Sequence, residues 1–202
     1  MIINEIKKKR YFMKGKRGYI YTAFYNQKKV AIKKKNPKSE AVARIANEAI
    51  WLKELNNYHI GPKLLESTLD YIIYEFVEGR FILEYFRQVD KNKILIIIKD
   101  LFKQMRQLDK LKVNKEEMHH PIKHVVVNKE KATLLDFERC KKTEKPKNVT
   151  QFCQFLISRN LSSLLKNKGL EFNKKKIINS AKKYKNCPDK KSFERIMKEF
   201  GF

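Results

Sequence analysis

The chain has 202 residues and a formal net charge of +25, with 42% apolar and 34% charged positions. This length and apolar content predict one compact domain or two small lobes, and they exclude a wholly disordered chain. The longest apolar run, Ile94–Ile98, is far shorter than the roughly 20 residues that cross a bilayer, and the start has no secretory pattern, so we expect a cytoplasmic protein without a membrane partner.

The first third of the chain has the composition of β-strands. Alternating and β-branched runs predict strands over 10–12, 18–25 and 29–33, joined by short connections that favour antiparallel pairing. After Asn36-Pro37, apolar residues recur at helical spacing and predict a helix from a cap at Ser39 to about Asn56. Two more strands are predicted over 63–68 and 70–77.

From Glu78-Gly79 onward the pattern is mostly helical. Residues 81–89 and 91–110 carry helical periodicity, and two short apolar runs, 125–127 and 132–135, predict a β-hairpin. The remainder predicts two or three basic helices between Asn148 and Phe202, interrupted at Gly169 and Pro188.

Two charged residues occupy positions where apolar residues are expected. Glu48 lies in the apolar stripe of the first helix, and a buried carboxylate needs a partner. Lys33 ends the strand Val30–Lys33 and is the nearest candidate. Alternatively, Lys33 extends to solvent and the helix is turned so that Glu48 is exposed.

Two further motifs suit phosphate and metal chemistry. The turn from Met13 to Gly18 carries glycines that let backbone N–H groups approach a phosphate, although such a turn is also an ordinary hairpin. Asp136 follows the apolar run Ala132–Leu135 and offers an oxygen ligand for Mg²⁺, or else a cap.

Taken in order, these motifs resemble the protein-kinase signature set, and most closely the small atypical kinases: the Rio kinases, the small kinase of the tRNA threonylcarbamoyl-adenosine complex and related archaeal serine/threonine kinases. The resemblance rests on the glycine turn with Met13 in place of its first glycine, Val30-Ala31-Ile32-Lys33, Glu48, Tyr74–Val77 and Asp136-Phe137. It covers roughly residues 10 to 165, and no Ala-Pro-Glu motif or long activation segment follows Asp136.

The resemblance implies an α+β, two-lobed fold with an antiparallel sheet and one helix in residues 1–77 and a small, mainly helical lobe in 78–202. ATP would lie between the lobes, with Mg²⁺ or Mn²⁺ held by Asp136. Lys33, positioned by Glu48, would contact the α- and β-phosphates. The other residues implied to contact ATP are Gly15, Gly18, Ile20, Ala31, Glu75 and Val77.

The catalytic loop departs from the kinase pattern, because residues 115–125 contain no Asp. One alignment makes Glu117 the base that orients the substrate hydroxyl and places Lys123 or His124 at the metal-holding Asn. A second alignment puts His119 on the missing Asp and His124 on the Asn. Glu138 stands where the metal motif normally has glycine, which argues against regulation by loop flipping.

A zinc site built from His119, His120, His124 and Cys140 is disfavoured, because Pro121 prevents one regular helical face and the spacing matches no zinc motif. The three cysteines, Cys140, Cys153 and Cys187, also suggest no disulfide framework.

The expected activity is therefore transfer of the ATP γ-phosphate to a serine or threonine hydroxyl of a protein. Two alternatives stay open: a nucleotide-binding pseudokinase that acts as an assembly module on RNA or ribonucleoprotein, and a small-molecule kinase. The positive charge would attract an acidic or RNA-associated partner, or it serves only as solvated surface. The sequence contains no aromatic RNA-binding strand motif.

Overall fold

The computed structural model describes residues 1–14, 18–36 and 44–202. They form two compact units, each described here by itself. The first unit comprises Met1–Glu78 and Thr133–Cys140, and the second comprises Gly79–Ala132 and Lys141–Phe202. The described residues contain a five-stranded antiparallel sheet and seven α-helices, so the fold class is α+β, as predicted.

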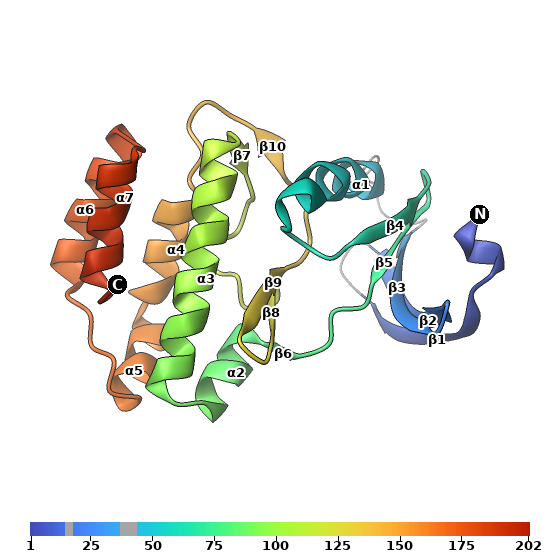
Figure 1. The fold of residues 1–202 in the computed structure, drawn as a ribbon, viewed down its shortest axis with the longest axis horizontal. Coiled ribbons are helices and arrows are strands. Elements are labelled where there is room, and N and C mark those ends of the chain that lie inside the picture. Colours follow the sequence, from blue (N-terminus) through green and yellow to red (C-terminus); the bar gives the residue numbers. More distant parts are fainter. Residues whose placement is uncertain (15–17, 37–43) are drawn as a thin grey trace. The chain divides into compact units, whose positions relative to one another are not determined.

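The sheet of the first unit has the strand order β1-β2-β3-β5-β4 (Figure 1). Its strands are β1 (Lys7–Lys14), β2 (Gly18–Tyr25), β3 (Lys28–Lys35), β4 (Leu64–Ser67) and β5 (Tyr71–Glu75). Asn26 and Gln27 join β2 to β3 with φ of +45° and +62°. Two consecutive residues with positive φ match the right-handed twist of a two-residue hairpin, so this connection fixes the register of the pair.

Alternation along β3 separates the two faces of the sheet. Val30 and Ile32 are fully buried and pack with Ala23 and Ile73 on one face. The three isoleucines Ile2, Ile3 and Ile6 lie against this cluster; the first two belong to a 3-10 helix (Ile2–Asn4) that was not predicted. Period-2 alternation therefore directs Lys33 to the opposite face.

Helix α1 (Arg44–Leu55) buries Ile45, Glu48, Ala49, Trp51, Leu52 and Leu55. Glu48 is thus inside the apolar stripe, and the alternative with an exposed Glu48 is excluded. The predicted cap, Ser39, lies outside the described residues. A 3-10 helix (Asn56–Tyr58) follows, and the Asn56 amide group donates to the carbonyls of Ile60 and Pro62, which closes the turn into β4.

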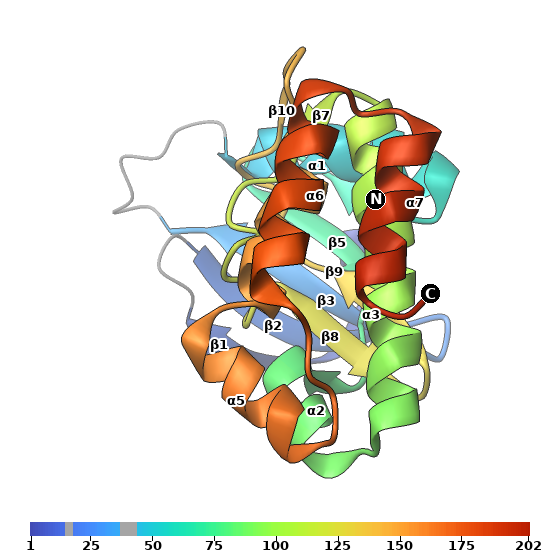
Figure 2. The same cartoon turned by 90° about the vertical axis from the view of Figure 1, so that its left-hand side faces the viewer.

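The second unit is mainly helical. Its helices are α2 (Ile82–Gln88), α3 (Lys91–Lys110), α4 (Asn148–Leu156), α5 (Arg159–Asn167), α6 (Lys174–Asn186) and α7 (Lys190–Glu199). Helices α6 and α7 run side by side in Figure 2 and pack together. In the described chain, α3 and the other helices are not long and apolar enough to span a membrane.

The predicted number of helices after Asn148 was too low, since four are present instead of two or three. Ser158 adopts an extended conformation at the N-cap of α5 and so separates α4 from α5. Asp189 caps α7 through a 2.6 Å bond from the Ser192 N–H, next to the predicted break at Pro188. The break at Pro188 was predicted, so the missed one is the short interruption at Ile157 and Ser158, which contains no Gly or Pro to mark it.

The predicted hairpin is present as β8 (Val125–Asn128) and β9 (Lys131–Leu134), which pair with β6 (Arg80–Phe81) in the order β6-β8-β9. A further antiparallel pair joins β7 (Val113–Asn114) to β10 (Lys141–Lys142). The strands β6, β7 and β10 were not predicted, because two residues are too few to show alternation.

A buried polar network joins three helices of the second unit. One Asp109 carboxylate oxygen accepts from Asn148 N and Nδ2, at 3.1 and 2.7 Å, and the other accepts from the Tyr184 hydroxyl at 2.9 Å. The Asn148 side chain also donates to the Val113 carbonyl and accepts from the Lys115 N–H. Each of these buried groups has its partner in the network, as a folded interior requires.

We predict that Asn148→Ala lowers the free energy of unfolding by about 2–4 kcal/mol, because it removes partners from a buried carboxylate, a carbonyl and an N–H at once. Urea denaturation of the full chain measures this loss. The exposed Asn179→Ala in α6 is the control. A loss below about 1 kcal/mol for Asn148→Ala would show that water replaces the network at little cost.

Candidate functional site

Lys33 is the centre of a charged cluster in the first unit. Its side chain is 12% exposed, and its Nζ lies 2.6 Å from Glu48 Oε2, 3.2 Å from Asp136 Oδ1 and 3.5 Å from Glu138 Oε2. The expected pair of Lys33 with Glu48 is therefore present. Asp136 joins the same ammonium group although it is 103 residues away in sequence.

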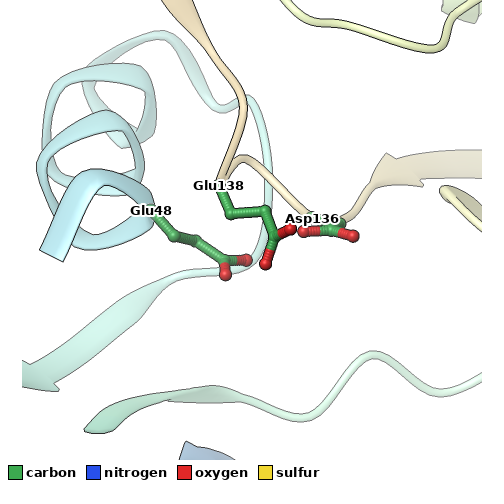
Figure 3. A group of neighbouring side chains, drawn as sticks. All are labelled: Glu48, Asp136 and Glu138. Atoms are coloured by element: carbon green, nitrogen blue, oxygen red, sulfur yellow. The ribbon is translucent and has the colours of Figure 1, made fainter. Parts of the chain in front are cut away.

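Three separate elements bring these groups together. Strand β3 supplies Lys33. Helix α1 supplies Glu48, and the segment after β9 supplies Asp136 and Glu138, as Figure 3 shows for these three carboxylates. Asp136 has φ of +62°, a left-handed conformation that Asp adopts more readily than most residues. The backbone N–H of the following residue, Phe137, donates to Glu48 Oε1 at 3.4 Å. A hydrogen bond therefore links the turn at Asp136 to the Glu48 carboxylate of α1.

Glu138 is the member of the cluster that the sequence analysis did not place in the candidate site. Its carboxylate is 8% exposed, lies 3.5 Å from Lys33 and is 3.8 Å from the Arg44 guanidinium. The Asn47 amide holds the Glu138 backbone by donating to its carbonyl at 2.9 Å. No local pattern marks this residue, because the left-handed backbone at Asp136 interrupts the extended conformation in which residues i and i+2 share a face.

The electrostatics of the cluster are dominated by burial and by mutual attraction. Burial alone would lower the pKa of Lys33, but the carboxylates of Glu48, Asp136 and Glu138 outweigh it and raise that pKa well above its ordinary value. Burial raises the pKa of Glu48, and Lys33 offsets part of that effect. Burial, with the negative charge of Glu48, also raises the pKa of Tyr74. Lys33 therefore stays charged at neutral pH.

The cluster can hold a divalent cation. Ligand oxygens of Glu48, Asp136 and Glu138 all lie within 4.8 Å of one another. When all groups are ionised, three carboxylates face the Lys33 ammonium group and the Arg44 guanidinium, which leaves an excess of one negative charge. Carboxylate oxygens are the ligands that Mg²⁺ and Mn²⁺ take in proteins, so the donor set fits the metal expected at Asp136.

Four of the residues expected to contact ATP lie on or next to the sheet of the first unit. Ile20 pairs with Lys33, and the buried Ala31 pairs with Tyr74, so both lie on the face of the sheet that carries the cluster. The N–H of Glu75 donates to the Lys63 carbonyl at 2.9 Å, so this N–H is engaged within the protein. Val77 follows two residues later, beyond the end of β5.

Packing between strands explains why glycine occupies position 18. A Cβ added there would lie 2.5 Å from the Lys34 carbonyl oxygen, so close approach of β2 to β3 requires glycine at this position. The glycine therefore does not by itself indicate a phosphate site. Gly15, the other glycine of the turn, lies outside the described residues.

The predicted catalytic loop belongs to the second unit. Glu117 has φ of +71°, and its carboxylate lies 3.2 Å from His124 Nε2. His119 and Lys123 are exposed. Among the described residues, the histidines of this loop do not join a cluster of three metal-ligating groups. The structure thus brings Glu117 and His124 together, although the two alignments had given them separate roles.

No protein-family model matches the chain. The sequence is similar to the uncharacterized protein MJ1211 of Methanocaldococcus jannaschii, with 26% identity over 114 residues. This match covers 55% of the present chain and 97% of the archaeal protein.

We predict that Lys33→Met destabilises the protein by about 3–5 kcal/mol at pH 8, because it leaves three carboxylates close together without their buried cation. A raised pKa in the folded state means that Glu48 stabilises the fold below its ordinary pKa of 4.5 and that this contribution is lost as the pH rises through the folded value. The deficit of Lys33→Met relative to the native chain should therefore shrink at pH 4.5.

Urea denaturation at pH 4.5, 6 and 8 measures this dependence, and 10 mM Mg²⁺ should restore part of the loss at pH 8. Lys34→Met is the matched control, since Lys34 lies on the other face of β3. An equal deficit for Lys33→Met at all three pH values would contradict the coupling of Lys33 to the carboxylates.

Proposed function

We propose that the protein is an ATP-dependent phosphotransferase of the atypical kinase type, which transfers the γ-phosphate to a serine or threonine hydroxyl. The observation that carries this proposal is the contact of Lys33 with Glu48 and Asp136, at 2.6 and 3.2 Å. A buried ammonium group oriented by one carboxylate and adjacent to a metal-ligating one is the arrangement that phosphoryl transfer uses to bind a triphosphate.

Each residue of the first unit would then contact a different part of ATP or its metal ion. Lys33, held by Glu48, would donate to the α- and β-phosphate oxygens, and Asp136 with Glu138 would hold Mg²⁺. When bound, the metal ion would neutralise charge on the β- and γ-phosphates. Ile20 and Ala31 would pack against the adenine ring of ATP. The Glu75 carbonyl and the Val77 N–H would form hydrogen bonds with the edge of that ring.

Glu117 is the proposed base for the acceptor hydroxyl. Its carboxylate is 40% exposed, so an incoming hydroxyl can reach it. His124, 3.2 Å away, would fix the orientation of that carboxylate. Positioning of the hydroxyl for in-line attack is the main contribution that phosphoryl transfer asks of such a residue.

A second candidate is a nucleotide-binding pseudokinase. The observation that favours it is the same contact between Glu117 and His124, since a carboxylate oxygen engaged by the His124 ring is not free to accept from a substrate hydroxyl. In that case the cluster around Lys33 would bind nucleotide without transfer. Turnover separates the two candidates.

We predict that the native chain binds ATP with Mg²⁺ and transfers label from [γ-³²P]ATP to itself or to a casein-type protein acceptor. Asp136→Asn should lower transfer by about 100-fold or more, because it removes a charge aimed at the metal and the phosphates. Glu117→Gln should keep ATP affinity within about twofold and lower transfer by about 10²–10⁴-fold, as expected for loss of a base.

Glu130→Gln is the control, because Glu130 is an exposed carboxylate in the turn between β8 and β9. Calorimetric ATP binding without transfer to protein, sugar, choline or nucleoside acceptors would select the pseudokinase. Transfer only to a small molecule would replace the protein acceptor. No ATP binding by the native chain would end the proposal.

A further inference from the structure

The first three strands of the first unit form a basic, aromatic surface without acidic residues. Strands β1 and β3 each carry five Lys or Arg residues, and β1 and β2 together carry six Tyr or Phe residues. None of the 24 positions in the three strands is Asp or Glu. Strand β1 forms one edge of the sheet, and all eight of its residues are exposed (Figure 1).

Strand pairing sorts part of this set onto one face, opposite the cluster around Lys33. Tyr11 pairs with Tyr21, Lys14 with Tyr19, and Tyr19 with Lys34. The register shift between Tyr11 and Met13 keeps Lys14 on the same face as Tyr11 despite their odd spacing. We call this face the Tyr/Lys platform, and its members are Lys9, Tyr11, Lys14, Tyr19, Tyr21 and Lys34.

The rings of the platform are held in place by their neighbours. Tyr21 packs against the buried cluster of the sheet, and Tyr11 meets it edge-on with ring centroids 5.9 Å apart. The Lys9 ammonium group lies 4.4 Å from the Tyr21 ring, and the Lys14 ammonium group lies 5.8 Å from the Tyr19 ring. Tyr11 nevertheless leaves 60% of its surface exposed.

Among the described residues, Lys9, Lys14 and Lys34 form no ion pair with a carboxylate. Glu66, on the same face, accepts instead from the Tyr71 hydroxyl. Burial lowers the pKa of Lys9, and the like charge of Lys34 lowers it further. In the described part of the chain, the ion pairs of β3 belong to Lys28, Lys29 and Lys33, and not to Lys34. A ligand that brings negative charge would therefore relieve repulsion that the fold itself leaves in place.

Protection of a sheet edge explains the lysines but not the aromatic residues. Lysine on an edge strand discourages pairing with another chain, whereas exposed apolar side chains there promote it. Tyr11, Phe12 and Met13 are consecutive, and each is at least 41% exposed. Aromatic rings beside cations suit a ligand that has both flat faces and negative charge, which is the chemistry of single-stranded nucleic acid.

We propose that the Tyr/Lys platform binds single-stranded RNA, with bases stacked on Tyr11 and its neighbouring rings and phosphates on Lys9, Lys14 and Lys34. A duplex would not serve, because its bases are already stacked and the platform offers no helix or ribbon to enter a groove. The phenolic hydroxyls of the three tyrosines can donate to and accept from a ribose 2′-OH, which favours RNA over DNA.

The test is fluorescence anisotropy of the full chain with a labelled, unstructured 12-nucleotide RNA. Tyr11→Ala should weaken binding about tenfold, since stacking on one ring is worth roughly that factor or more, whereas Tyr11→Phe should stay within about twofold of the native chain. Lys9→Gln/Lys34→Gln should reduce the slope of log K against log salt by about 1.4, for two phosphate contacts on a single strand.

Lys174→Gln/Lys175→Gln on α6 is the matched control, because it removes the same charge from exposed positions of the second unit. Three results would overturn the proposal that the platform binds RNA. They are an equal loss of RNA affinity in the control pair, an unchanged RNA affinity in Tyr11→Ala, and displacement of the RNA by polyglutamate as effective as displacement by unlabelled RNA. Equal affinity for DNA of the same sequence, or for duplex RNA, would overturn its selectivity. Since Tyr11 lies outside the cluster around Lys33, loss of RNA binding with ATP binding intact distinguishes this proposal from the proposed function.

Discussion

The burial of the Lys33 ammonium group is the constraint on which the first unit depends. An ion of this size is expensive to remove from water, and it is retained only when opposite charges lie within contact distance. Glu48 at 2.6 Å supplies the nearest of these, and it is itself buried in the apolar stripe of α1. Strand and helix are therefore fixed to each other by a charge that neither could bury alone.

Much of the first unit could be predicted from the sequence because its signals are local. Alternation in Val30–Lys33 placed the lysine on one face, and four-and-three spacing placed Glu48 inside a helix stripe. Glu138 escaped prediction because its inclusion depends on the left-handed turn at Asp136 and on the contact from Asn47, 91 residues away. Neither feature leaves a pattern in neighbouring residues.

The Tyr/Lys platform shows a different limit of sequence reading. Tyr11 and Lys14 differ by an odd number of residues, so strict alternation assigns them to opposite faces. The irregular pairing after Tyr11 reverses that assignment, and a bulge cannot be located from composition. The aromatic residues are also divided between two strands, so no single segment resembles an RNA-binding motif even where the folded face collects them.

The chain enters the first unit twice, first with Met1–Glu78 and again with Thr133–Cys140. During translation, the ribosome therefore releases Lys33 and Glu48 long before the two carboxylates that complete their surroundings. A nascent chain that has not reached Asp136 has only Glu48 of the three carboxylates that contact Lys33 in the complete protein. Shortened versions of the protein that end near Glu78 would lack Asp136 and Glu138, so the N-terminal segment alone cannot complete the cluster around Lys33.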